Sequence, residues 1–185
     1  MKSAKSKNGK RIYFICLVAT MAAMVVVLEN FLSINIDVNL KITLHGLPLL
    51  VVGILYGPIF GLITGLVAGV IAQLTSKYGV DITSVFWVLA YLAWGYVSGL
   101  LFKVFKKMKV MPRYVLSILG ASVSATLLNT FAMLISTVLI KNSGYTFASI
   151  MVNLPIRLLN MVLSLIPYVL ICRIVCERIK IYLEE

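Results

Sequence analysis

The sequence predicts an all-α integral membrane protein: a bundle of six transmembrane helices in a single domain over residues 1–185, with both termini in the cytoplasm. Three observations lead to this fold class. Hydrophobic residues make up 61% of the chain and charged residues 12%, with a mean hydropathy of +1.03 that soluble domains do not reach. The basic residues gather in three clusters beside apolar segments, and a glycine-rich apolar run is interrupted by one proline.

The apolar segments leave room for six helices, since one crossing takes about 20 residues. We expect the spans at residues 12–32, 44–56, 59–76, 84–102 and 114–140, and within 147–175. The second span is short for a crossing. In the sixth, Pro155 suits a first helical turn, so that helix begins either near residue 147 or at this proline.

The segments outside the spans are short and polar. Residues 1–11 form a basic cytoplasmic tail. Residues 33–43 alternate polar and apolar side chains, which suits a short ordered loop or a strand-like cap better than a helix. Residues 77–81 contain Gly79, which permits a tight turn.

Glycines recur at every fourth position of the second and third spans. On helices they would line a groove that another helix can approach closely. They are Gly53, Gly57, Gly61, Gly65 and Gly69. Pro58 removes a backbone donor and clashes with the preceding turn, so it marks either a kink in one long helix or a reversal between two helices.

The basic clusters decide between a kink and a reversal. Of 17 Lys and Arg residues, five precede the first span, five lie in residues 103–113 and three lie in the C-terminal segment. The positive-inside rule places all three clusters in the cytoplasm, which requires an even number of crossings between them. A hairpin at Gly57-Pro58 meets this requirement and one kinked helix does not. We therefore expect the connections 33–43, 77–83 and 141–146 outside.

Several classes of function are disfavoured by composition and motifs. The net charge of +11 lies beside apolar spans, where basic residues set orientation and meet anionic lipid, so we expect no nucleic-acid partner. Cys16, Cys172 and Cys176 lie in or beside apolar segments without metal-ligand spacing, so we expect no metal and no cofactor. The basic start and apolar run are similar to a signal peptide, but we interpret them as a retained first helix because more spans follow.

Arg157 is the only basic residue inside a predicted span, and such residues usually face a cavity or a partner. On a helix it forms one polar stripe with Asn153, Asn160 and Ser164. Arginine can pair with a carboxylate through two parallel hydrogen bonds, and the Asn amides can bind a heterocycle edge. We expect Arg157, Asn153 and Asn160 in a substrate site. The alternative is that Arg157 reaches the lipid headgroups.

The fourth span carries Trp87, Tyr91 and Trp94 on one face, where a flat ring could stack. Trp87 lies near the outer end and is equally suited to anchor the helix at the membrane interface. Tyr91 lies deeper in the span and is the better candidate for a substrate contact.

Four more polar residues are candidates for the same site. Asn129 and Gln73 lie inside spans, where polar residues either bridge helices or touch a ligand. His45 and Lys41 flank the outer start of the second span and could draw an anionic substrate inward, or be solvated. A lone histidine is no metal site.

The stretch LHGLPLLVVGILYGPIFGLITGLVAG, the six-helix layout, and Ala19 and Ala23 in the first span resemble the substrate-binding S components of energy-coupling-factor (ECF) vitamin transporters. The resemblance implies a receptor in a bacterial plasma membrane that captures a vitamin near the outer surface. It also implies docking through the first helices, with Ala19 and Ala23, on a transmembrane scaffold subunit driven by two cytoplasmic ATPases. Packing within the bundle would explain the two alanines equally well. No Gly-rich phosphate loop occurs in the sequence, so ATP hydrolysis is expected of the partners.

Within that family, the segments LKITLHGLP and NLPIRLLN are most similar to the folate-type S components, although this chain has Gln73 where many relatives carry Asp. The resemblance therefore implies folate, with pantothenate or another small vitamin as the alternative.

An integral-membrane enzyme is the more distant alternative. It would need converging acids, bases or metal ligands. The six acidic residues lie at span ends, in loops or in the tail, so we expect no enzymatic activity. An ion-coupled transporter working alone would need buried acids or internal repeats, and the sequence has neither.

Overall fold

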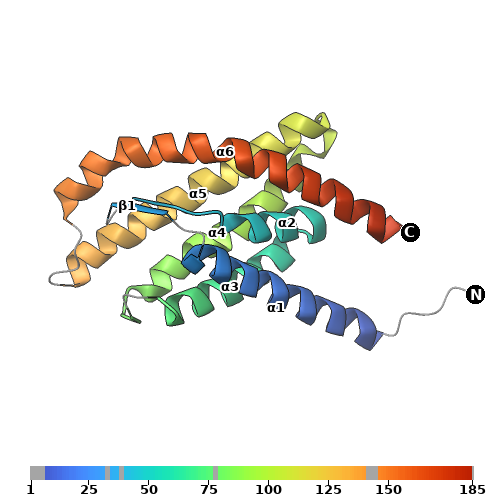
Figure 1. Ribbon diagram of the computed structural model, residues 1–185, viewed down its shortest axis with the longest axis horizontal. Coiled ribbons are helices and arrows are strands. Elements are labelled where there is room, and N and C mark those ends of the chain that lie inside the picture. Colours follow the sequence, from blue (N-terminus) through green and yellow to red (C-terminus); the bar gives the residue numbers. More distant parts are fainter. Residues whose placement is uncertain (1–6, 32–33, 38–39, 77–78, 141–145, 185) are drawn as a thin grey trace, which may run out of the picture.

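The computed structural model describes residues 7–31, 34–37, 40–76, 79–140 and 146–184. Within these residues the chain forms six α-helices joined by short connections (Figure 1). They are α1 (Lys7–Phe31), α2 (Gly46–Tyr56), α3 (Pro58–Leu74), α4 (Ser84–Val104), α5 (Val110–Leu139) and α6 (Phe147–Glu184), with a short 3-10 helix η1 (Phe105–Lys107) after α4. The predicted six-helix bundle is confirmed. Helices α1, α4, α5 and α6 are long and apolar enough to cross a membrane, whereas α2 and α3 are shorter.

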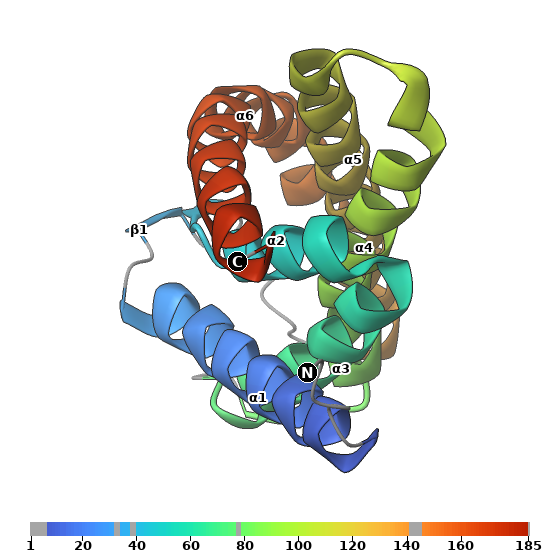
Figure 2. The same ribbon diagram turned by 90° about the vertical axis from the view of Figure 1, so that its right-hand side faces the viewer.

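A small β-hairpin interrupts the helices between α1 and α2. Strand β1 (Ile34–Asp37) pairs antiparallel with β2 (Leu40–Ile42), and Ile34 lies opposite Ile42. Strand β2 contacts α6, and Figure 2 shows the hairpin at the side of the bundle near the start of α2. Within the segment 33–43, the described residues 34–37 and 40–42 thus form the predicted strand-like cap, so the fold is not purely helical.

The chain reverses at Gly57. Its φ of 100° lies in the left-handed region, which favours glycine. Gly53 and Gly61 lie four residues to either side, and a methyl group added at Gly61 would lie 3.0 Å from the Cα of Gly53. In one continuous helix these two residues would be about 12 Å apart. Pro58 opens α3, where its missing N–H has no helical partner to lose. The predicted Gly-Pro hairpin is confirmed.

Helix α4 occupies the groove that the regular glycines were expected to form. A methyl group added at Gly53 or Gly61 would meet the carbonyl oxygen of Gly95, and one added at Gly65 would meet the carbonyl oxygen of Tyr91. The backbones of α2 and α3 therefore lie directly against α4. This contact fixes the position of α4 and of the aromatic side chains that it carries.

The remaining helices surround this centre. Helix α4 also packs against α5, α1 packs against α3 and α2, and α6 packs against α5 and α2. Short helix α2 is consequently enclosed, and residues such as Leu49, Leu50 and Val52 are fully buried. Figure 2 shows α2 between α1 on one side and α6 on the other.

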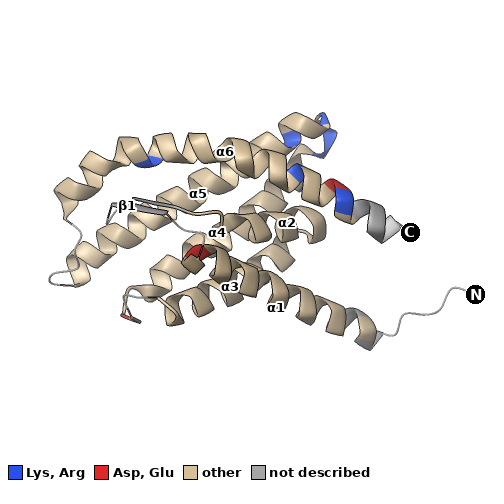
Figure 3. Cartoon of the chain, in the orientation of Figure 1, with Lys and Arg blue, Asp and Glu red and all other residues tan. Residues whose placement is uncertain are grey.

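The two ends of the bundle differ in charge. The start of α1, the turn at Gly57, η1 and the end of α6 lie at one end, which we call the basic end (Figure 1). Apart from Arg157, the described Lys and Arg side chains gather there, at the connection from α4 to α5 and in the part of α6 near Arg173 and Arg178 (Figure 3). The hairpin, residues 79–83 and the start of α6 lie at the opposite end, which we call the loop end.

Helix α6 begins at the earlier of its two expected starts and extends beyond its expected end. It begins at Phe147 and passes through Pro155 and Pro167, so the alternative start at Pro155 is wrong, and it continues to Glu184. The start is set by reciprocal capping: the Ser149 N–H donates to Thr146 Oγ1 at 3.2 Å, and the Thr146 N–H donates to Ser149 Oγ at 3.1 Å. Internal prolines are tolerated in membrane helices because neighbouring groups satisfy the freed carbonyls.

Candidate functional site

Four aromatic side chains meet beside the residues that follow the hairpin, and we call them the His45 cluster: His45, Tyr91, Trp94 and Tyr168. The His45 ring centroid lies 5.3 Å from that of Tyr91 and 6.3 Å from that of Trp94. Trp94 lies 5.2 Å from Tyr168. His45 directly precedes α2, while the other three come from α4 and α6, so the cluster joins three elements.

Hydrogen bonds tie the His45 cluster to the segments around it. The Tyr168 hydroxyl donates to the Thr43 carbonyl at 2.9 Å, and the Thr43 hydroxyl is hydrogen-bonded to Nδ1 of His45. The Tyr91 hydroxyl donates to Oε2 of Glu29, near the end of α1. The residue that follows the hairpin is therefore held to α6, and α1 is held to α4.

Gly46 explains why the indole of Trp94 can pack so closely on α2. A methyl group added at Gly46 would lie 2.9 Å from the Trp94 ring. The sequence His45-Gly46 thus places an imidazole at the cluster and leaves the next position open for a large ring.

Burial divides the cluster into a packed part and an accessible part. Tyr91, Trp94 and Tyr168 are 6%, 8% and 3% exposed. His45 and Glu29 are half-buried. The aromatic rings consequently form a rigid wall, and the imidazole and the carboxylate are its accessible polar groups.

Arg157 lies further along α6 and is directed toward α5. Its Nη1 donates to the Thr130 hydroxyl at 3.3 Å and contacts the Met133 sulfur at 3.0 Å. Arg157 lies ten residues after Phe147, which is about 15 Å along the helix axis. The guanidinium therefore faces the neighbouring helix, which argues against the alternative that it serves only to reach lipid headgroups.

The polar stripe around Arg157 also faces the bundle. Asn153, Asn160 and Ser164 are half-buried. Between them, Val152 and Leu159 are 72% and 60% exposed. The Asn153 side-chain amide donates to the Ser149 carbonyl at 2.9 Å, within its own helix. The stripe predicted from helical spacing thus lies on the less exposed face of α6, and its part in a substrate site stays a prediction.

The two groups overlap only partly in depth: Tyr168 lies 11 residues, about 16 Å, further along α6 than Arg157, whereas Tyr91 lies nearer to the level of Arg157. Ser136 of α5 donates a 3.1 Å hydrogen bond to the hydroxyl of Thr83, which places the start of α4 level with Ser136. Tyr91 then lies about 12 Å below that level and Thr130 about 9 Å below it. The Tyr91 ring and the hydroxyl that binds Arg157 are therefore at comparable depths, on adjacent helices.

The other polar candidates are spread over the bundle. Trp87 is half-buried in the first turn of α4, Asn129 is half-buried beside Thr130, and Gln73 is half-buried at the end of α3. Lys41 lies in β2 opposite Asn35, and its side chain is outside the described residues. Their roles in the site stay predictions.

Ala19 and Ala23 lie on the outward face of α1. Both are exposed, whereas Ala22 and Val25 are fully buried. The two alanines therefore do not pack inside the bundle, which removes that explanation for their spacing.

The sequence analysis missed three contributors to the site: Glu29, Thr43 and Tyr168. Glu29 was considered only as an acid at a span end, and its partner Tyr91 is 62 residues away. Tyr168 lies 125 residues from Thr43. Only the packing of α1, α4 and α6 brings these residues together. A single sequence without an alignment contains no signal for that packing.

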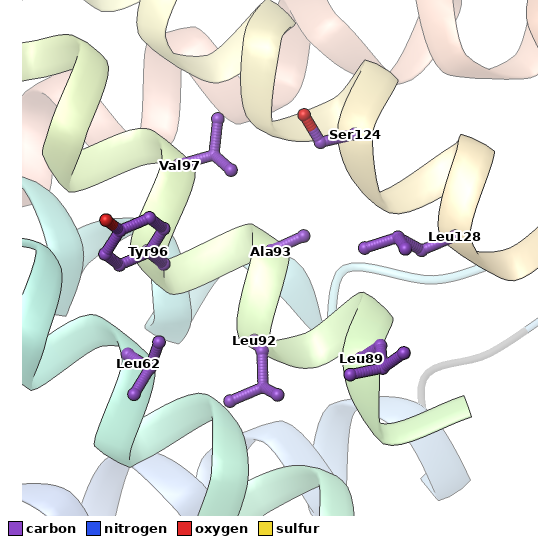
Figure 4. Close-up of a pocket in the computed structure, with 8 residues that line it drawn as sticks. All are labelled: Leu62, Leu89, Leu92, Ala93, Tyr96, Val97, Ser124 and Leu128. Carbon is purple, nitrogen blue, oxygen red and sulfur yellow. The ribbon is translucent and has the colours of Figure 1, made fainter. Parts of the chain in front are cut away.

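An apolar groove of about 250 Å³ lies between α3, α4 and α5 (Figure 4). Its lining residues are Leu62, Leu89, Leu92, Ala93, Tyr96, Val97, Ser124 and Leu128. It has no charged side chain among them and includes no predicted site residue. The groove suits hydrocarbon, so the His45 cluster and Arg157 remain the candidate site for a polar ligand.

Comparisons with known proteins agree on one class. The sequence model of a family described as ECF-type riboflavin transporter, S component, matches residues 10–176. A solved structure, the crystal structure of FolT bound with folic acid, is similar with a TM-score of 0.53 and 24% identity, covering 84% of this chain and 86% of that chain. No curated protein matches the sequence. At this identity the structural likeness shows the fold.

Proposed function

The chain belongs to the family of ECF-type riboflavin transporter S components, and from this premise we propose that its substrate is folate, captured at the loop end. As a member of this family it is a multi-pass membrane protein that binds a vitamin and works with ECF module subunits. It is a substrate-binding subunit and not an enzyme. The choice of vitamin rests on the chemistry of the candidate site.

One observation carries the proposal: an aromatic wall and a guanidinium lie in the same bundle, with Tyr168 of the wall about 16 Å beyond Arg157 along α6. The half-buried ring of His45 is the accessible flat surface, and the buried rings of Tyr91 and Trp94 pack beside it. Arg157 is held toward α5 by Thr130. Folate carries a flat pteridine ring at one end and two carboxylates at the other. A ring can stack on aromatic side chains, and a carboxylate can pair with arginine in two parallel hydrogen bonds.

The other vitamins match only one half of this arrangement. Pantothenate has a carboxylate but no ring to stack. Riboflavin, which the family description names, is the second candidate because it has a flat ring system, but it has no carboxylate for Arg157. The similar fold that was solved with folic acid adds support for folate.

The orientation follows from charge. We place both termini and the basic end in the cytoplasm and the loop end outside, since Lys and Arg favour the cytoplasmic side. Five basic residues lie between the last turn of α4 and the first turn of α5: Lys103, Lys106, Lys107, Lys109 and Arg113. The vitamin would then reach the His45 cluster from outside, beneath the hairpin.

Uptake requires partners in this proposal. Ala19 and Ala23, exposed on α1, form the contact with a transmembrane scaffold subunit, because small side chains allow another helix to approach closely. Two cytoplasmic ATPase subunits attached to that scaffold would supply the energy. In this proposal the protein lies in the cell membrane of a bacterium.

The direct test is the identity of the bound vitamin. The full chain is purified in detergent, any copurifying small molecule is identified by mass spectrometry, and folic acid, riboflavin and pantothenate are titrated by calorimetry. Tight binding of folic acid, and not of the other two, supports the proposal. Selective binding of riboflavin or pantothenate would overturn the choice of substrate and leave the family unchanged.

A further inference from the structure

Glu29 is a carboxylate with no assigned role inside the proposed vitamin site. Of the three acidic residues whose side chains the structure describes, Asp81 caps the start of α4 through Thr83 and Ser84, and Glu177 pairs with Arg173 on the surface of α6. Glu29 differs from both because its partner Tyr91 belongs to the His45 cluster. A charge within a membrane bundle is costly and usually functional.

The Tyr91 bond fixes where the carboxylate lies. The Tyr91 ring is buried and packed against His45, so its hydroxyl has a defined position. That hydroxyl donates to Oε2 of Glu29. The Glu29 side chain is half-buried and therefore still accessible at this wall. A carboxylate offers about four acceptor sites, so protein donors and a ligand can share it.

The chemistry of a carboxylate selects the edge of a ring that it can bind. It accepts hydrogen bonds and donates none when ionised, so it suits an edge with two adjacent N–H donors. The 2-amino-4-oxo-pteridine ring of folate has such an edge, formed by its 2-amino group and N3–H. The corresponding edge of riboflavin has one N–H between two carbonyl oxygens. Those oxygens would face the carboxylate with their lone pairs and be repelled.

From this geometry we infer that Glu29 is a specificity-determining residue, which binds the 2-amino and N3–H edge of a pteridine ring and rejects rings with a 2-oxo group. The inference rests on the proposed function and adds the basis of its discrimination between folate and riboflavin. Tyr91 acts as a positioning residue that holds the carboxylate in place. Leaving a buried polar group opposite a mismatched ring edge is the general source of such discrimination.

The test uses two ligands that differ at one position. They are folic acid and its analogue with a 2-oxo group in place of the 2-amino group, both titrated against the purified full chain. The wild type should bind folic acid at least about tenfold more tightly than the 2-oxo analogue, which is the effect expected for a hydrogen bond to a charged group. Equal binding of the two ligands by the wild type would overturn the inference without any variant.

The variant Glu29→Gln exchanges one acceptor for a donor at nearly constant shape. Its amide oxygen can still accept the Tyr91 hydrogen bond, while its NH₂ can donate to a 2-oxo group. The preference for folic acid should therefore shrink below about threefold or reverse. Tyr91→Phe keeps the carboxylate but removes the hydrogen bond that positions it. The variant should therefore bind both ligands more weakly and still prefer folic acid.

The outcomes separate this inference from the proposed function. If the wild type binds folic acid and Glu29→Gln lowers both affinities by the same factor, Glu29 is only a structural link between α1 and α4, and the inference fails alone. If the wild type binds riboflavin and neither pteridine ligand, the proposed substrate and the inference fail together.

Discussion

Gly61 of α3 and Gly95 of α4 lie in backbone contact, and a methyl group added to either one would overlap the carbonyl oxygen of the other. Trp94 precedes Gly95 in α4, and Tyr91 lies one helical turn earlier. The contact between two glycines therefore sets the position of the aromatic wall relative to α2 and α3. Stability and vitamin binding should both depend on it.

Gly61→Ala should destabilise the protein by about 1–3 kcal/mol, because overpacking forces α3 and α4 apart. The melting temperature of the detergent-solubilised chain should fall by several degrees, and affinity for the vitamin should fall with it. Gly9→Ala is the matched control, since a methyl group there meets nothing within 4 Å. Equal melting temperatures for the two variants would show that the glycine contact is not a tight one in solution.

The fold was predictable because its signals are local. A four-residue glycine period, one Gly-Pro step and three basic clusters are all visible without knowledge of distant contacts. The signal for the helix start at Phe147 was also local, because Thr146 and Ser149 cap it. Pro155 favoured a second, later start. Proline is a weaker boundary signal in membranes, where internal prolines are tolerated.

The site was only partly predictable. Periodicity identified the inward face of α6 at Arg157 and the aromatic face of α4 at Tyr91. It could not show that Glu29 meets Tyr91 or that Tyr168 meets Thr43, because those contacts depend on how three helices pack. Faces of single helices follow from sequence period, whereas their convergence is a tertiary property.

Ala23→Leu should prevent assembly with the scaffold subunit and leave vitamin binding unchanged. A leucine at this exposed position fills the space into which another helix would pack. Assembly is measured by copurification with the ECF module, and vitamin affinity by calorimetry on the isolated chain. Ala148→Leu, on an exposed position of α6, is the control. A fully assembled Ala23→Leu complex would place the docking face elsewhere.

The two ends of the bundle should be labelled from opposite sides of the membrane. In a Cys16→Ser background, we introduce Val80→Cys at the loop end or Lys107→Cys at the basic end; both positions are exposed. A membrane-impermeant maleimide added to intact cells should label the cysteine at residue 80. It should label the one at residue 107 only after permeabilisation. The remaining Cys172 and Cys176 are fully buried and should stay unlabelled. Labelling of both sites in intact cells would contradict the placement of the two ends on opposite sides of the membrane.

Arg157→Ala should weaken folic acid binding at least about 30-fold, because loss of a charged partner in a desolvated site costs about 2–5 kcal/mol. Its contacts to α5 include a 3.3 Å hydrogen bond to the Thr130 hydroxyl and a 3.0 Å contact to the Met133 sulfur, and the melting temperature of the variant measures the effect of their loss on the fold. Arg157→Lys keeps the charge but loses the paired geometry, and should fall between the wild type and the alanine variant.

The ligand itself provides the sharper comparison. Pterin contains the ring of folate without its carboxylates, so Arg157→Ala should bind pterin as the wild type does. Arg173→Ala is the matched control for loss of an arginine, because Arg173 pairs with Glu177 on the surface of α6. If Arg157→Ala lowers the affinities for pterin and folic acid by the same factor, Arg157 supports the bundle through α5 and does not bind the carboxylate. If only folic acid is weakened, the guanidinium and the aromatic wall bind opposite ends of one ligand.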